Sequence, residues 1–130
     1  MRTQITPTQL RHLLAADGYL DLQLPEAALR ELRKSANLGP MEGPRMLLMG
    51  KALKQMFQHD EAIEVLERAA RILPKPVRRI AWRELVECYR SVGSEQLADF
   101  AEQLAGEEPL RFSVSLADSE IVLESDSSPC

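Results

Sequence analysis

The chain has 130 residues, a net charge of −4 at pH 7, and 45% hydrophobic but only 5% aromatic residues. One domain of this size buries about two-thirds of its unfolded surface, so it needs no disulfide or metal to fold. The acidic balance argues against a nucleic-acid partner, because domains that bind nucleic acid usually carry a clear basic excess. No segment approaches the roughly 20 apolar residues of a membrane span, so we expect no membrane partner.

The N-terminal part of the chain predicts two helices. Thr6 begins a Thr-x-x-Gln capping box, Pro7 suits the first helical position, and apolar residues at helical spacing continue to about Leu22. Pro25 begins a second helix, which the Asn-Leu-Gly-Pro run at 37–40 ends. We therefore expect a helical hairpin here.

The same pattern predicts two more hairpins. The third helix begins at Gly43-Pro44, and the fourth, with Asp60 as its expected cap, ends at Pro74. The fifth helix spans about residues 77–92, and a Gly-Ser turn leads into a sixth that ends before Pro109.

The C-terminal segment 110–130 differs from the rest of the chain. It carries one basic and four acidic residues, and apolar side chains alternate with small ones from Phe112 to Leu116, which is typical of a strand. A lone hairpin is marginal in water. We therefore interpret this segment as an acidic tail that is disordered or weakly β, following a helical domain over residues 1–109.

The helical units repeat. The segments before Pro40 and Pro74 match when one is moved 34 positions along the other, and a third unit matches at an offset of 36, with Lys75-Pro76 as an insertion. Such a period is typical of helix–turn–helix arrays, whose units must stack to bury their apolar faces. Other pairs that match at 34 are Ala16 and Gly50, Tyr19 and Leu53, Ala28 and Ala62, Leu32 and Leu66, and Leu38 and Ile72.

The matched positions resemble the tetratricopeptide repeat (TPR) over about residues 8–109. That family places a large residue, a Leu-Gly pair and a Tyr along helix A, then Ala, a bulky residue, Ala and Pro along helix B. The corresponding residues are His12, Ala15-Ala16, Tyr19, Ala28, Leu32, Ser35 and Pro40 in the first unit; Met46, Met49-Gly50, Leu53, Ala62, Leu66, Ala69 and Pro74 in the second; and Trp82, Leu85-Val86, Tyr89, Ala98, Glu102, Ala105 and the displaced Pro109 in the third. Glu102 departs from the pattern, and terminal repeats are often atypical.

The resemblance implies an all-α fold, a short right-handed α-solenoid of about three antiparallel helix hairpins. It also implies a concave groove, lined by the A helices, that binds a protein or peptide. Residues expected to face this groove are Leu13, Asp17, Leu20, Leu47, Lys51, Lys54, Ile80, Arg83, Glu87 and Arg90. One TPR subgroup clamps the C-terminal carboxylate of chaperones, but only Lys51 suits that clamp here, so we do not expect this activity.

Four basic residues of the expected groove suggest a ligand chemistry. Lys51, Lys54, Arg83 and Arg90 could form a basic strip that pairs with acidic side chains of a peptide. The alternative is that they are ordinary solvated charges, since acidic residues share their face.

Small residues are expected where paired helices meet closely. Ala16 and Gly50 on the A helices, and Ala28 and Ala62 on the B helices, occupy such positions. A larger side chain there would cost about 1–3 kcal/mol.

No catalytic or metal-binding constellation can be assembled. The only histidines, His12 and His59, have no Cys/His cluster near them, so we expect no metal and no cofactor. Cys88 lies among apolar helical positions without a base, and we expect it to be a small buried residue. The chain is therefore not expected to be an enzyme. Core positions are predicted for Met46, Met49, Trp82 and Tyr89, and His12 is expected to be a packing residue.

Two functions follow as hypotheses. The first is a non-catalytic protein- or peptide-binding module that acts as an adaptor or scaffold. The second is a structural subunit that forms a homo-oligomer through its terminal repeat or its tail. Two cysteines, Cys88 and Cys130, make no disulfide framework, and the N-terminus lacks the apolar core of a signal peptide, so a cytoplasmic location is expected.

Overall fold

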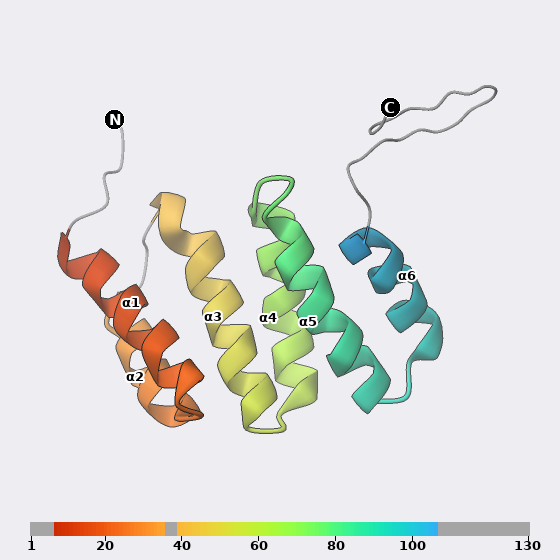
Figure 1. The fold of residues 1–130 in the computed structure, drawn as a ribbon, viewed down its shortest axis with the longest axis horizontal. Helices are drawn as coiled ribbons and strands as arrows, with labels where there is room; N and C mark the ends of the chain where they lie inside the picture. The colour runs from red at the N-terminus through yellow and green to blue at the C-terminus, as the bar shows by residue number, and fades with distance from the viewer. Residues whose placement is uncertain (1–6, 36–38, 107–130) are drawn as a thin grey trace.

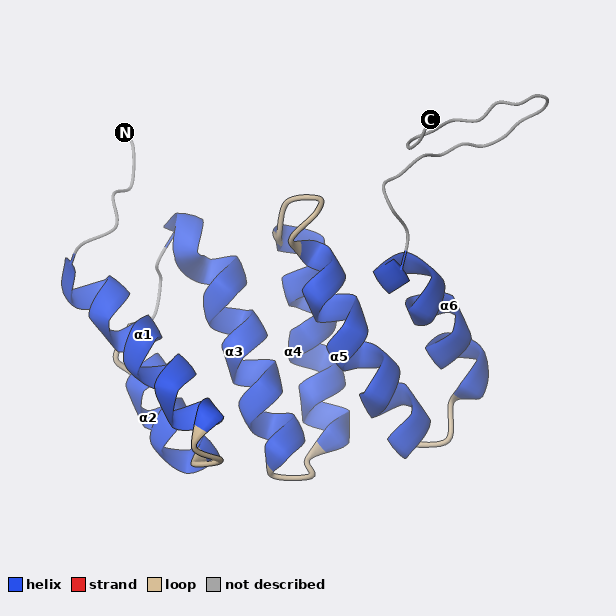
Figure 2. Ribbon diagram, viewed as in Figure 1, coloured by secondary structure: helices blue, strands red, loops and turns tan. Residues whose placement is uncertain are grey.

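The computed structural model describes residues 7–35 and 39–106 of the chain. Helices make up this part, and it contains no strand, which confirms the all-α expectation there (Figure 2). Outside the described residues lie the expected cap Thr6, Asn37 and Leu38 of the expected stop of the second helix, and the tail predicted for 110–130. The second helix itself ends at Arg33, ahead of the expected stop at 37–40. The helices are α1 (Pro7–Asp21), α2 (Pro25–Arg33), α3 (Glu42–Gln55), α4 (His59–Ile72), α5 (Arg78–Ser91) and α6 (Glu95–Gly106), with a short 3-10 turn η1 (Gly39–Met41) before α3.

The six helices form three pairs that lie side by side in chain order (Figure 1). Within the pairs α1 packs on α2, α3 on α4 and α5 on α6. Between the pairs α2 packs on α3 and α4 on α5, while α1 also contacts α3 and α3 contacts α5. We call α1, α3 and α5 the A helices and α2, α4 and α6 the B helices.

Each A helix ends in the same hydrogen-bonded turn. The N–H of the first residue after the turn donates to the carbonyl five residues earlier, and the residue before this donor has a positive φ, as in a Schellman motif. The three bonds run from Leu24 to Tyr19 at 2.8 Å, from Gln58 to Leu53 at 2.9 Å and from Ser94 to Tyr89 at 2.8 Å. The left-handed residues are Gln23 at 59°, Phe57 at 61° and Gly93 at 85°. The left-handed residues are therefore separated by 34 and 36 positions, the same offsets that relate the repeats in the sequence.

The apolar side chains form two clusters joined at Leu53. One cluster is shared by α1, α2 and α3, and the other by α3, α4, α5 and α6. The small residues expected at close helix contacts are buried, and a Cβ atom built on Gly50 would lie 2.4 Å from Leu66 Cδ2. Ala28 and Ala62 are likewise without exposed surface. This confirms that small residues allow each A helix to approach its B helix.

The expected cap of α4 is wrong. Gln58, not Asp60, precedes the helix, and its side chain makes no capping hydrogen bond. The Schellman turn explains why the helix begins here. The turn ends at Gln58, and the Gln58 carbonyl accepts the first helical hydrogen bond of α4, from Ala62 N–H at 2.9 Å. Asp60 lies inside the first turn instead, where a negative charge is stabilised by the helix dipole.

Candidate protein-binding surface on the A helices

The expected groove residues divide into a buried and an exposed group. Leu13, Leu20 and Leu47 are buried in the two clusters, so the expectation that they face a groove is wrong. These positions are taken up by packing because each A helix contacts both its own B helix and a neighbouring pair. Asp17, Arg83 and Glu87 are exposed and Lys51 and Lys54 are half-buried. We call these five residues the A-helix surface.

Lys54 connects α3 to α5 across this surface. Its Nζ lies 2.6 Å from Glu84 Oε1 and 2.5 Å from Glu87 Oε1. Burial acts to lower the pKa of Lys54, but the hydrogen bonds to both carboxylates outweigh it, and the pKa is raised above its usual value. Lys54 is thus held charged and neutralised, so it is not free to bind a ligand anion.

Arg90 is directed to the neighbouring B helix. Its guanidinium lies 2.8 Å from Glu102, 3.7 Å from Glu95 and 3.8 Å from Asp99, all on α6. The hydrogen bond to Glu102 is the main cause of its raised pKa. Arg90 therefore belongs to an α5–α6 ion cluster, and the basic strip expected of Lys51, Lys54, Arg83 and Arg90 stays a prediction.

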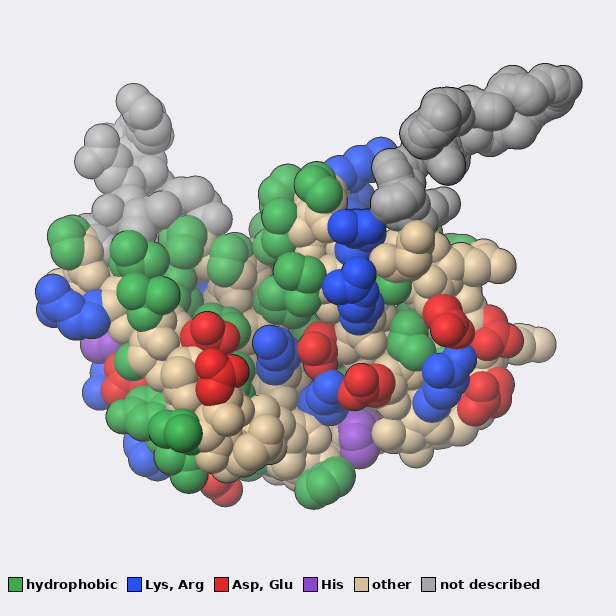
Figure 3. Space-filling model, in the orientation of Figure 1, with side chains coloured by type: hydrophobic (Ala, Val, Ile, Leu, Met, Phe, Trp, Pro, Cys, Tyr) green, Lys and Arg blue, Asp and Glu red, His purple; other side chains and the backbone are tan. Residues whose placement is uncertain are grey.

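Lys51 and Arg83 form no hydrogen bond or ion pair within residues 7–35 and 39–106. Lys51 lies one turn before Lys54 on α3, and Arg83 directly precedes Glu84 on α5. The ion pair between Lys54 and Glu84 joins these two helices next to both cations. Figure 3 shows blue and red side chains mixed over α3, α5 and α6. Two cations without an ion pair among the described residues thus lie beside a cluster of one cation and two carboxylates.

The sequence missed the acidic partners of this surface. Glu95 and Asp99 were not singled out, Glu84 was considered only as an unsuitable position of the carboxylate clamp, and Glu102 was noted only as a departure from the repeat pattern. A signal was present, since Asp99 and Glu102 replace Ile63 and Leu66 at the offset of 36. Such a replacement of apolar by acidic residues at equivalent positions indicates a surface that no further helix covers.

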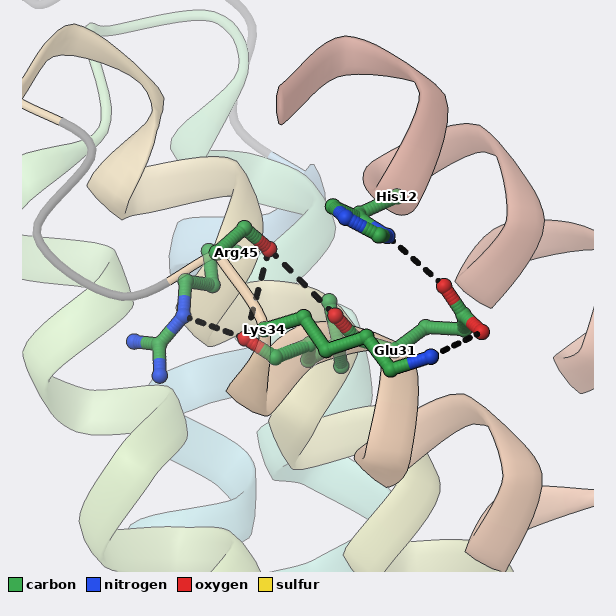
Figure 4. Close-up of polar contacts among 6 residues, drawn as sticks. His12, Glu31, Lys34 and Arg45 are labelled. Atoms are coloured by element: carbon green, nitrogen blue, oxygen red, sulfur yellow. Dashed lines mark hydrogen bonds and ion pairs between the residues drawn. The ribbon is translucent and has the colours of Figure 1, made fainter. Parts of the chain in front are cut away.

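A second polar cluster joins the first three helices. His12 Nδ1 on α1 donates to Glu31 Oε1 on α2 at 2.8 Å, and Lys34 lies 3.3 Å from the other carboxylate oxygen (Figure 4). The hydrogen bond from His12 is the main cause of the lowered pKa of Glu31. Arg45 on α3 donates through Nε to the Leu32 carbonyl at 3.0 Å. His12 was expected to be a packing residue, and the structure shows it as a hydrogen-bond donor between α1 and α2.

The remaining chemistry-bearing side chains are structural. Tyr89 is buried as predicted, and its hydroxyl donates to Glu67 on α4 at 2.6 Å. Trp82 and Met46 pack against the second cluster, and Met49 against the first, which confirms their core positions. Cys88 is fully buried as expected, and burial raises the pKa of its thiol to about 11.

No group of three His, Cys, Asp or Glu side chains in 7–35 and 39–106 is arranged to hold a metal ion. None of the helices α1 to α6 combines the length and apolar character needed to cross a membrane.

Comparison of the chain with models of known protein families, with curated proteins and with solved structures yields no match. The TPR resemblance therefore depends on the motif residues of this chain alone.

Proposed function

We propose that the protein is a short TPR-like array of three helix hairpins that binds a protein or peptide without catalysing a reaction. The repetition of the Schellman turn and of the small residues at offsets of 34 and 36 supports this architecture. The A-helix surface is the proposed binding site, and the cytoplasm its proposed location.

The observation that carries this function is the unequal pairing of the basic residues. Lys54 and Arg90 are neutralised by acidic neighbours, whereas Lys51 and Arg83 have no such partner among the described residues. An acidic side chain of a partner that pairs with either cation gains a charge-assisted hydrogen bond, worth about 1.5–3 kcal/mol when shielded from water. We infer that the partner segment carries at least two acidic side chains.

The experiment is affinity capture from the source lysate with wild-type protein and two double variants. Lys51→Glu/Arg83→Glu reverses the two unpaired cations, and Arg68→Glu/Arg71→Glu makes the same charge change on exposed residues of α4. We expect a partner that the wild type and the α4 variant retain and the first variant loses. Its binding should weaken with salt, since the contacts are ionic. A partner held equally by all three proteins would contradict the proposed site.

A further inference from the structure

Large apolar side chains are exposed along one face of α1 and directly after it. Leu14 and Leu22 are 63% and 69% exposed, and Leu10 is 43% exposed. With Gly18 they recur at every fourth position: Leu10, Leu14 and Gly18 lie on α1, and Leu22 directly follows its last residue. Leu22 continues the stripe, since its N–H donates to the Gly18 carbonyl at 3.2 Å. We call these four residues the α1 stripe; Figure 3 shows hydrophobic side chains gathered at the α1 end of the molecule.

The equivalent face of the other A helices is an interface. At the offset of 34, Leu14 corresponds to Leu48, which packs against the cluster of the preceding hairpin, and Gly18 corresponds to Ala52, which is fully buried. At the further offset of 36 Cys88 takes this place and is also fully buried. The α1 stripe is therefore a stacking face to which none of the described residues is docked.

The equivalent face of α6, in the last of the three hairpins, is acidic rather than apolar. In α4, Ile63 and Leu66 pack in the cluster shared with α5, but the equivalent residues of α6 are Asp99 and Glu102, both largely exposed. An apolar stripe gains nothing by stacking on this acidic face. Head-to-tail association of two copies is therefore disfavoured.

The α1 stripe is complementary to itself. If two copies pair antiparallel with the two-fold axis at the level of Ala16, Leu10 of one copy lies opposite Leu22 of the other, and Leu14 lies opposite Gly18. A Cβ at Gly18 would have no atom within 4 Å in one copy, so the space over this glycine is open for the opposing leucine.

Charges on the same face fit the same register. Arg11 and Asp21 are exposed and equidistant from Ala16, so Arg11 of each copy lies opposite Asp21 of the other. Neither forms an ion pair within the described part of the chain. We propose that the α1 stripe is a self-association surface whose occupant is a second copy of this chain, an inference that goes beyond partner binding by the A-helix surface.

The size of the α1 stripe limits the affinity expected for the dimer. The part of α1 from Leu10 to its end at Asp21 is about 17 Å long, and Leu22 follows directly. One helix face of this length offers less than the roughly 800 Å² per partner of a standard interface. We therefore expect a weak dimer, populated at concentrations of about 10 µM to 1 mM.

Sedimentation equilibrium over that range tests the apolar contact. We expect wild type to dimerise and Leu14→Glu to weaken dimerisation by about tenfold or more. Leu97→Glu, which changes a half-exposed leucine of α6 in the same way, should leave it unchanged. A wild-type chain that remains monomeric to about 1 mM, or equal effects of the two variants, would overturn the proposal.

A mixing experiment tests the register. Arg11→Asp places two carboxylates, and Asp21→Arg two guanidinium groups, at the paired positions of each copy, so each variant alone should dimerise less than wild type. An equal mixture of the two restores both ion pairs and should form a heterodimer. Association no stronger in the mixture than in the separate variants would overturn the antiparallel register.

Discussion

Gln23 and Phe57, 34 residues apart, have nearly the same left-handed backbone conformation, with φ of 59° and 61°. Each precedes the residue whose N–H closes the turn onto the carbonyl of the A helix. Neither residue type favours this conformation, which glycine adopts without steric cost. The turn is thus imposed by hairpin packing at these two positions, whereas the third hairpin uses Gly93.

The turn residues should respond oppositely to substitution. We expect Phe57→Gly to stabilise the protein by about 1 kcal/mol, because the strain is relieved and the side chain is already 81% exposed. Gly93→Ala should destabilise it by about 1–2 kcal/mol for the converse reason. Urea unfolding followed by circular dichroism measures both. A loss of stability in Phe57→Gly would instead show that its edge contact with His59 matters more than the backbone.

Gly50→Ala should destabilise the protein. The new Cβ would lie 2.4 Å from Leu66, which is fully buried and has no free direction to move. Overpacking costs about 1–3 kcal/mol, and the gain in helix propensity offsets about 1 kcal/mol of this. We expect a net loss of up to about 2 kcal/mol.

Gly18→Ala is the matched control, since a Cβ there meets nothing within 4 Å. Measured at low micromolar concentration, where self-association is absent, it should gain up to about 1 kcal/mol from helix propensity. Equal effects of the two substitutions would contradict the close approach at Gly50.

Lys54→Met should destabilise the pairing of α3 with α5. The substitution leaves Glu84, which is largely buried, beside Glu87 without its cation. We expect a loss of about 1–2 kcal/mol, more than for an exposed pair because one carboxylate is shielded from water. Lys51→Met, one turn away and without an ion pair in the described chain, should change the stability by less than about 0.5 kcal/mol. Thermal unfolding of both variants at low and high salt measures this difference in stability.

The Glu31 carboxylate should make stability depend on acid pH. Its pKa is held below the usual 4.5 by His12, so the carboxylate stabilises the folded state above that pH. This contribution is lost as the pH falls through the folded-state pKa. Glu31→Gln should therefore show a shallower loss of stability between neutral pH and pH of about 3 than wild type.

The matched control for this pH series is Glu64→Gln. Glu64 is exposed and forms no ion pair within the described residues, so its variant should follow the wild-type curve. Parallel curves for Glu31→Gln and wild type would contradict the role of His12.

Cys88 should be unreactive in the folded protein. Its thiol is fully buried and its pKa is raised to about 11, so little thiolate exists at neutral pH and reagents cannot reach it. In a Cys130→Ser background, labelling with a thiol reagent should occur only on unfolding. Rapid labelling of the folded chain would indicate that α5 opens from the core.

The sequence predicted the helices and their pairing well because both depend on local signals. Proline at the first helical position and small residues at a fixed offset are readable without tertiary contacts, as Pro25 and the pair of Ala28 and Ala62 demonstrate. The cap of α4 was not predicted, because it follows a Schellman turn in which Phe57 has a positive φ. Phenylalanine does not favour that conformation, so its presence in the sequence gives no signal for the turn.

The exposed surface was predicted less well. Helical spacing places Leu47 and Lys51 on one side of the same helix, but it does not tell that packing buries Leu47 and leaves Lys51 half-buried. The partners of Lys54 and Arg90 lie 30 and 12 residues away on other helices, at Glu84 and Glu102, and pairs at such distances follow from packing rather than from periodicity.

The three A-to-B turns share the same hydrogen bond and a left-handed residue, whereas the connection between α4 and α5 has absorbed the two-residue change in period. Its residues 74–77 are exposed, and Arg78 fixes its end by donating from Nε to the Leu73 carbonyl at 3.1 Å. Because this loop is exposed, a reporter epitope or a protease site can be inserted there without altering the register of the helices. Scaffold engineering can use it to extend or label the array while all three hairpins remain intact.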